Sequence, residues 1–310
     1  MNMSEATHLT PESLRGILRM DVDMRRHTSW NAGGRAERLY QPADIQDLLA
    51  FLRTLPVNEP LLTVGLGSNL LVRDGGFPGT VLLLHAALSE LRLEEDGTIY
   101  AQAGVPGAKL ARFAAKHNLR GAEFFAGIPG TVGGMLAMNA GCYGSETWNW
   151  VSKVQVIDNN QFILNRLPVE YEIAYRHLIR KNATSGLYNP ELFVGAWFKL
   201  EPGNGEVSRQ EIKTLLSKRI ASQPLNLPNA GSVFRNPVGD HAARLIEASG
   251  LKGKKIGGAQ VSEKHANFIV NIGNATAQDI ETLILEVQAI VLEKTGVTLH
   301  PEVRIVGMPV

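Results

Sequence analysis

Three short segments of the chain carry side chains suited to acid–base and anion chemistry. They are AYR with Arg176, GSVFRNP with Ser232, and LHPEVR with Glu302. Arginine offers a permanent cation, serine a hydroxyl proton, and glutamate a carboxyl whose protonation depends on burial. Each has an ordinary alternative: an ion-pair arginine, a hydroxyl bonded within its own turn, and a solvated acid. Held around one substrate, they would suit a reaction that develops negative charge and then takes up a proton.

Two glycine-rich segments predict close approach of the backbone to phosphate. Residues 65–70 read GLGSNL after a predicted strand, but the following NLLV is β-like, so a Rossmann fingerprint is excluded. Residues 127–141 read GIPGTVGGMLAMNAG, and a helix capped by Thr131 would offer free N–H groups to a pyrophosphate. The alternatives are a plain tight turn for the first segment and glycine-rich helix packing for the second. Together they suggest one extended dinucleotide held between two subdomains.

The pattern of apolar residues predicts the elements that position these groups. Thr10-Pro11 favours a short helix to Leu18, and Ser208 with Glu211 forms a capping box for a helix to about Ser222. Asp96-Gly97 marks a hairpin turn. The other predicted helices span about 42–55, 107–117, 240–249 and 276–291, and the other predicted strands lie at 61–65, 80–84, between 150 and 200, and at KIGGAQV, FIVNI and the end of the chain.

Chain length and element order predict an α+β protein with more than one core. A chain of 310 residues exceeds the size at which a single hydrophobic core stops growing. A Pro- and Asn-rich stretch, QPLNLPNAGSVFRNP, marks the expected boundary before the C-terminal part. We therefore expect three parts, residues 1–84, 85–218 and 219–310.

The overall composition limits the kinds of molecule that the protein is expected to bind. Lys plus Arg (31) nearly cancels Asp plus Glu (30), so no global field favours nucleic acid or an anionic membrane. No stretch approaches the roughly 20 apolar residues of a membrane span, and the first residues lack a signal-peptide pattern. We expect a cytoplasmic protein without nucleic-acid, membrane or metal partners, whose oligomeric state the sequence leaves open. The single cysteine, Cys142, is expected to be a small packed residue.

In their order along the chain, these motifs resemble the MurB family of peptidoglycan synthesis. The resemblance rests on both glycine segments, AYR, RIASQP, NAGSVFRNP, ARLIEASGLKGKKIGGAQVSEKHANFIVN and LHPEVR, and covers the chain from about Arg26. HTSWNAGGRAE is similar to a family element that begins with Asn-Thr, although His27 stands in place of the Asn. The short connection from Arg176 to Ser232 resembles the branch of the family without an additional substrate-covering loop.

The resemblance implies a flavoenzyme. It implies non-covalent FAD in the two-subdomain fold of the vanillyl-alcohol oxidase (PCMH) type, a C-terminal α+β substrate-binding domain, and NADPH as co-substrate. The implied reaction converts UDP-N-acetylglucosamine enolpyruvate into UDP-N-acetylmuramate. The residues assigned to the cofactor are Gly65, Leu66, Gly67, Ser68, Asn69, Leu70, Gly127, Pro129, Gly130, Thr131, Gly133, Gly134, Asn139, Ala140 and Gly141.

The same resemblance assigns roles to the reactive side chains. Arg176 and a protonated Glu302 would stabilise an enolate, and Ser232 would deliver a proton to its α-carbon. Three further residues are assigned to substrate binding: Arg219 and Asn236 would anchor the diphosphate of UDP, and Tyr175 would help to close that pocket. For His265 and Asn267, orienting the substrate and completing a turn both remain open.

Two other functions are kept as alternatives. An oxidase with the same flavin fold would return electrons from a small alcohol to oxygen, although neither glycine segment offers an obvious residue for covalent flavin attachment. A nucleotide-binding module without catalysis would lose only ligand affinity when Arg176, Ser232 or Glu302 is replaced.

Overall fold

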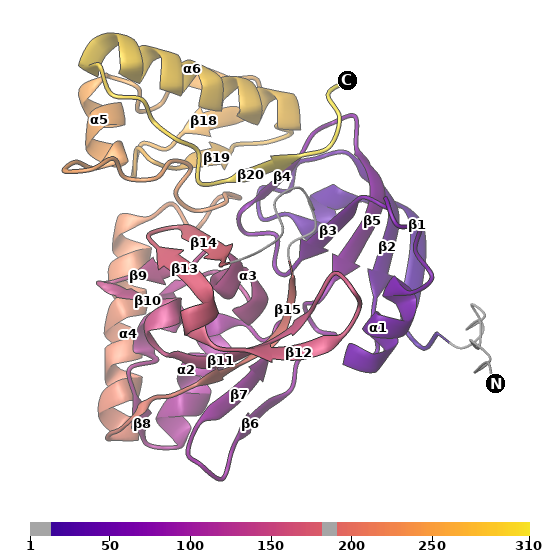
Figure 1. Cartoon of the computed structure of the whole chain (residues 1–310). Helices are drawn as coiled ribbons and strands as arrows, with labels where there is room; N and C mark the ends of the chain where they lie inside the picture. The colour runs from indigo at the N-terminus through magenta and orange to yellow at the C-terminus, as the bar shows by residue number, and fades with distance from the viewer. Residues whose placement is uncertain (1–13, 182–190) are drawn as a thin grey trace.

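The computed structural model describes residues 14–181 and 191–310, and it contains three sheet-based units (Figure 1). The first unit is a four-stranded sheet in the order β1-β2-β5-β3, with β1 antiparallel and the other pairs parallel. Its core buries residues of β2, β3 and β5, including Leu39, Leu62 and Val81. Its elements are β1 (Ile17–Asp23), β2 (Arg35–Gln41), α1 (Ile45–Leu52), β3 (Leu61–Val64) and β5 (Phe77–Leu83).

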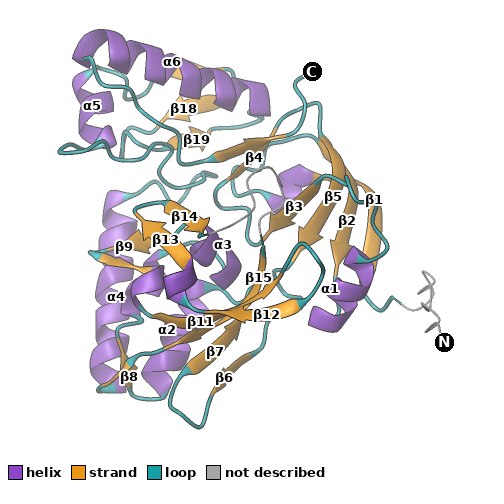
Figure 2. Ribbon diagram, viewed as in Figure 1, coloured by secondary structure: helices purple, strands orange, loops and turns teal. Residues whose placement is uncertain are grey.

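The second unit is a five-stranded antiparallel sheet in the order β12-β11-β15-β7-β6. Figure 2 shows helices α2 and α4 side by side in this unit, and they contact one another. Cys142 packs against this core, and burial raises the pKa of its thiol to about 11. The elements are β6 (Leu91–Leu93), β7 (Ile99–Gln102), α2 (Gly107–Lys116), α3 (Val132–Ala137), β11 (Val151–Ile157), β12 (Ile163–Arg166), β15 (Leu192–Phe198) and α4 (Gly205–Ser222).

In the C-terminal unit, helix α6 packs on a three-stranded antiparallel sheet, β17-β18-β19, and helix α5 packs on α6. Helix α6 buries a stripe that includes Ile280, Leu283, Ile284 and Val287, because these positions share one face of a helix. No helix within the described ranges is long and apolar enough to cross a membrane. The elements are α5 (Ala242–Ala248), β17 (Lys255–Ile256), β18 (Ala259–Val261), β19 (Ile269–Asn271) and α6 (Ala277–Thr295).

Among the described residues, four two-stranded sheets accompany the three larger sheets. The pair most relevant to the site is a hairpin of two four-residue strands with Tyr175 and Arg176 at its turn. The pairs are β13 (Tyr171–Ala174) with β14 (His177–Arg180), β9 (Gly141–Cys142) with β10 (Ser145–Glu146), β16 (Glu201–Pro202) with β8 (Leu119–Arg120), and β20 (Arg304–Val306) with β4 (Leu70–Val72).

The first unit and the C-terminal unit are joined over a broad contact. Strand β20, near the chain's end, runs parallel to β4 of the first unit, and Figure 1 shows the two strands side by side. Arg73 forms a bidentate ion pair with Glu281 of α6. Trp30 is fully buried in the C-terminal core, where its indole N–H donates to the Ile269 carbonyl at 2.8 Å. The segment after the first glycine loop is therefore fixed directly against the strand that follows Glu302.

Most predicted elements are present, and three local predictions are wrong. Residues 17 and 18 lie in strand β1, whereas the start of the helix predicted from Thr10 lies outside the described residues. Helix α4 begins at Gly205 under an Asn204 cap, and Ser208 lies inside the helix, where its hydroxyl donates to Glu123. Thr131 precedes α3 but makes no side-chain capping bond.

Replacing Trp30 with phenylalanine should destabilise the protein without unfolding it. The change removes the donor to the Ile269 carbonyl inside the core, and a buried group left without its partner costs about 1–3 kcal/mol. Trp197→Phe is the matched control, because the Trp197 indole bonds to the partly buried carboxylate of Glu94, which also pairs with Arg92. Urea unfolding midpoints measure both changes. Equal urea midpoints for the two variants would show that the Trp30 hydrogen bond does not stabilise the contact between the two units.

Candidate functional site

The structure brings two of the three reactive side chains into direct contact. The Nε of Arg176 donates to the Oε1 of Glu302 at 2.6 Å, and both side chains are about 15% exposed (14% and 15%). The other two guanidinium nitrogens donate to the carbonyls of Asn139 and Gly141. Arg176 is therefore held on three sides, by the C-terminal segment and by the end of the second glycine segment.

Arg176 has an unusual backbone conformation. It sits at the second position of the two-residue turn between β13 and β14, with φ of +53°. A left-handed conformation is unfavourable for a residue with a long side chain, so surrounding contacts must stabilise it. Tyr175, the other turn residue, is 46% exposed, and its ring centroid lies 5.0 Å from the Arg176 guanidinium carbon. The turn aims the guanidinium inward and leaves the tyrosine ring accessible.

The environment of Glu302 shifts the pKa of its carboxyl group upward. Burial raises the pKa of Glu302, and the positive charges of Arg176 and Arg235 offset only part of that rise. Desolvation penalises the charged form of an acid, whereas a nearby cation favours it. The two effects oppose each other here, and their net result is a raised pKa for Glu302.

Ser232 lies next to Glu302 through the backbone. The amide of Glu302 donates to the carbonyl of Val233 at 2.7 Å, and Phe234 pairs with Pro301 in an antiparallel bridge. Gly231, just before the serine, has φ of +74°, a conformation that glycine adopts without strain. Over residues 14–181 and 191–310, the Ser232 hydroxyl has no hydrogen-bond partner. The hydroxyl does not tie up its own turn.

Asn267 is the residue that secures this turn. Its side-chain oxygen accepts from the Phe234 amide at 3.0 Å, and its side-chain nitrogen donates to the Phe234 carbonyl at 2.8 Å. Its own carbonyl accepts from the Val233 amide. Of the two roles left open, the structure places Asn267 in turn formation. The Nδ1 of His265 accepts from the Asn267 amide, and burial lowers the pKa of that imidazole.

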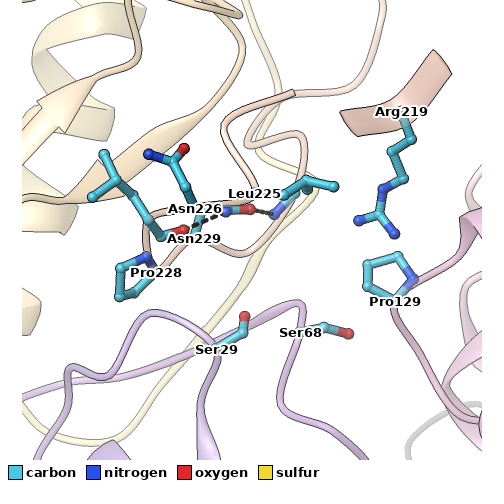
Figure 3. A pocket seen from close by; sticks show the side chains of 10 residues that line it. Ser29, Ser68, Pro129, Arg219, Leu225, Asn226, Pro228 and Asn229 are labelled. Atoms are coloured by element: carbon cyan, nitrogen blue, oxygen red, sulfur yellow. Dashed lines mark hydrogen bonds between the residues drawn. The ribbon is translucent and has the colours of Figure 1, made fainter. Parts of the chain in front are cut away.

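A cavity of about 390 Å³ lies between both glycine segments and the stretch before Ser232. Figure 3 shows Arg219 reaching from the end of α4 toward Pro129, with Ser29 and Ser68 on the opposite wall. Gly231 also lines this cavity. Within the part of the chain that the structure describes, Arg219 has no acidic partner and bonds only to Gln223 through its Nε. A half-buried cation facing a polar cavity is suited to an anionic ligand.

The remaining predicted and missed residues flank Ser232. Asn236 is exposed, and its side-chain oxygen accepts from the Ala242 amide at the start of α5, which leaves its N–H₂ group available. Arg235 belongs to the GSVFRNP motif of candidate residues, but the sequence assigned it no role. Its Nε is buried without a partner among the described residues, and its charge acts on Glu302. Its place in that motif, between Ser232 and Asn236, is the signal that the sequence offered.

The two glycine segments lie against each other. A Cβ on Gly65 would collide with the Thr131 hydroxyl, and one on Gly67 with the His27 carbonyl, so packing of the protein alone explains these two glycines. The side-chain nitrogen of Asn69 donates to the Glu302 carbonyl at 3.0 Å. The first segment therefore also contacts the C-terminal segment that carries Glu302.

Comparison with known proteins decides the family. Residues 223–306 match the C-terminal domain of UDP-N-acetylenolpyruvoylglucosamine reductase, and residues 36–164 match an FAD binding domain. A reductase of that name from Nitrosospira multiformis is 57% identical, covering 100% of this chain and 94% of its own. This chain belongs to the UDP-N-acetylenolpyruvoylglucosamine reductase family. A relative from Thiobacillus denitrificans is 55% identical over 99% of this chain and 97% of its own.

A solved structure of the same family has the same fold. The crystal structure of UDP-N-acetylenolpyruvylglucosamine reductase (MurB) from Thermus caldophilus superposes with a TM-score of 0.77 at 29% identity, covering 94% of this chain and 99% of that one. With the FAD-binding match, this confirms the α+β class, the two-subdomain FAD-binding fold with a C-terminal domain, and FAD as the cofactor.

The second glycine segment of this family member fits a large bound cofactor. Neither Gly130 nor Gly134 has a positive φ. The nearest atom to an added Cβ would be 3.6 Å away at Gly130 and 3.9 Å away at Gly134. Neither strain nor packing within the protein explains a glycine at these two positions. A ligand that approaches the backbone closely does explain it. We therefore expect residues 130–134, together with residues 65–69 opposite them, to hold the FAD.

Gly134→Ala should separate cofactor binding from folding. An added methyl group meets open space in the protein and should raise helix stability by roughly 0.5–1 kcal/mol, while it blocks the backbone face offered to FAD. We expect a lower flavin content at equal or higher apoprotein stability. Gly133→Ala is the control, since its Cβ would press against Ala103 at 3.0 Å and should lower apoprotein stability. Full flavin content in Gly134→Ala would refute this placement.

Proposed function

We propose that this chain reduces UDP-N-acetylglucosamine enolpyruvate to UDP-N-acetylmuramate with NADPH, using Arg176, Ser232 and Glu302 as its catalytic residues. The observation that carries the proposal is the buried contact between Arg176 and Glu302, next to a serine whose hydroxyl is free among the described residues. FAD, when bound, accepts hydride from NADPH and delivers hydride to the enolpyruvyl double bond.

Arg176 and Glu302 would stabilise the negative charge that develops on the substrate. Hydride addition to the β-carbon places charge on the α-carbon and its carboxylate. The guanidinium of Arg176 supplies a cation, and a protonated Glu302 would donate to a carboxylate oxygen. The contact between the two side chains holds both groups in place before the substrate arrives.

Ser232 would supply the proton to the α-carbon. A serine hydroxyl is a weak acid, but an enolate is basic enough to accept from it when the two are held within hydrogen-bond distance. The turn around Ser232 is secured by Asn267, so the hydroxyl is available for this transfer. The net result adds one hydride and one proton across the double bond.

Arg219 and Asn236 would bind the UDP diphosphate, and Tyr175 would help to close that pocket. Arg219 supports this assignment most directly, because burial lowers the pKa of its guanidinium and the described residues supply no acid to neutralise it. In this scheme residues 1–84 and 85–218 hold FAD and residues 219–310 hold the sugar nucleotide. We place the enzyme in the cytoplasm, where nucleotide sugars and NADPH occur.

An anaerobic experiment tests the proposed function. NADPH should bleach the yellow absorbance of the purified protein, and the enolpyruvyl sugar nucleotide should then restore it. An oxidase would instead recover its colour only when oxygen is admitted. A binding module without catalysis would bind the sugar nucleotide, but NADPH would not bleach its absorbance.

Ser232→Ala should affect one half of the reaction. NADPH should still bleach the flavin at the native rate, whereas recovery with the enolpyruvyl substrate should slow by about 10²- to 10⁴-fold, the typical loss for a positioned acid. Stopped-flow absorbance measures the two steps separately. Equal slowing of both steps would identify Ser232 as a structural residue.

Arg219→Gln should weaken binding of the sugar nucleotide. Removing a guanidinium that matches phosphate geometry should raise the substrate KM by at least about tenfold, since charge-assisted hydrogen bonds contribute about 1.5–3 kcal/mol. Flavin content should stay unchanged. Loss of flavin with an unchanged KM would instead assign Arg219 to the cofactor, whose predicted loops line the same cavity.

A further inference from the structure

The hairpin that carries Arg176 has few anchors of its own. Strands β13 and β14 form a separate two-stranded sheet of four residues each, and an isolated hairpin is marginally stable in water. At its base Tyr171 is buried against Trp148, but Ile173 and Tyr175 near its turn are exposed. The turn also carries the unfavourable positive φ of Arg176. Something other than apolar packing must fix the end of the hairpin.

Asn139 supplies that contact. Its side chain is 1% exposed, and its Nδ2 donates to the Ala174 carbonyl at 3.1 Å and to the Glu146 carboxylate at 2.9 Å. Its Oδ1 accepts from the Trp148 amide at 3.1 Å. Both N–H groups and the oxygen of the amide are therefore engaged by protein groups. This side chain is occupied within the protein rather than offered to the cofactor.

The backbone of Asn139 acts on the same target. Its carbonyl accepts from the Nη1 of Arg176 at 3.2 Å, and the carbonyl of Gly141 accepts from the Nη2. Asn139 has φ of +39°, a conformation that asparagine adopts more readily than most residues. One residue thus holds the hairpin through its side chain and the guanidinium through its carbonyl.

We propose that Asn139 is a positioning residue for Arg176. It fixes the turn of the β13–β14 hairpin so that the guanidinium meets Glu302, and it does so from within a segment that sequence comparison assigns to FAD binding. The inference rests on the proposed role of Arg176 in the substrate-dependent step. Under this proposal the Asn139 side chain positions Arg176 and does not contact the cofactor.

Asn139→Asp is the sharpest test, because it keeps the shape and backbone preference of the side chain. The carboxylate has no donor for the Ala174 carbonyl and repels the carboxylate of Glu146. Misplacing a reacting group by about 1 Å costs about 10²-fold in rate. We expect recovery of the yellow absorbance with substrate to slow by about that factor, while bleaching by NADPH and flavin content stay native.

Asn271→Asp is the matched control. Asn271 is also buried, and its amide also makes three hydrogen bonds: one donated to the Trp30 carbonyl and two accepted from the Gly273 and Ala275 amides. Its replacement should lower the melting temperature, and it should leave the ratio of the two half-reaction rates unchanged. A structural role for Asn139 would give the same pattern as this control.

A second measurement reads the alignment directly in the protein without substrate. The Arg176 Nε–H, which donates to Glu302, should give a slowly exchanging arginine signal in proton–nitrogen NMR, identified by its absence in Arg176→Lys. The signal should weaken in Asn139→Asp and persist in Asn271→Asp.

The outcomes separate this inference from the proposed function. If Arg176→Lys fails to slow the substrate-dependent step, the proposed role of Arg176 is wrong. If Arg176→Lys slows that step and Asn139→Asp does not, Asn139 is not a positioning residue. Loss of flavin in Asn139→Asp with slowing of both steps would return Asn139 to the cofactor site.

Discussion

The contact between Arg176 and Glu302 is the interaction on which the site depends. The two residues are 126 positions apart and come from the hairpin of the second unit and from the segment that precedes β20. Burying a charged group is unfavourable unless every part of it is paired, and here all three guanidinium nitrogens have acceptors. The pair thus depends on the second glycine segment and the C-terminal segment, and Asn69 of the first glycine segment bonds to the Glu302 carbonyl.

The glycine segments serve two purposes at once. Gly130 and Gly134 leave their backbone open on the side where a cofactor would lie, whereas Asn69 and Asn139 turn their amides toward the protein. Asn69 bonds to the Glu302 carbonyl, Asn139 to the hairpin of Arg176, and Asn267 to the turn that follows Ser232. The amide of one asparagine therefore bonds at or near each of the three reactive residues, and two of these asparagines belong to the segments assigned to FAD.

The sequence predicted helices and strands well where their formation depends on residues that are close together in the chain. The Thr276 cap and the apolar stripe of α6 are confirmed, because both depend on neighbours within a few residues. The predicted capping box at Ser208 is wrong, because Asn204 caps the helix. The Ser208 hydroxyl instead donates to the carboxylate of Glu123, which is 85 positions away. Family resemblance named Arg176, Ser232 and Glu302, but the long-range partners of Asn69, Asn139 and Asn267, and the buried Nε of Arg235, leave no local pattern. Only the folded chain reveals them.

The most direct measurement is a double-mutant cycle on the substrate-dependent step, with Arg176→Lys, Glu302→Gln and the pair of changes together. Rates are taken from the return of the yellow absorbance after bleaching by NADPH, with NADPH bleaching as the internal reference. Residues that act as one unit are strongly non-additive, so the double variant should be little slower than the slower single variant. If the two losses multiply, the side chains act independently and the buried contact is not the basis of the site.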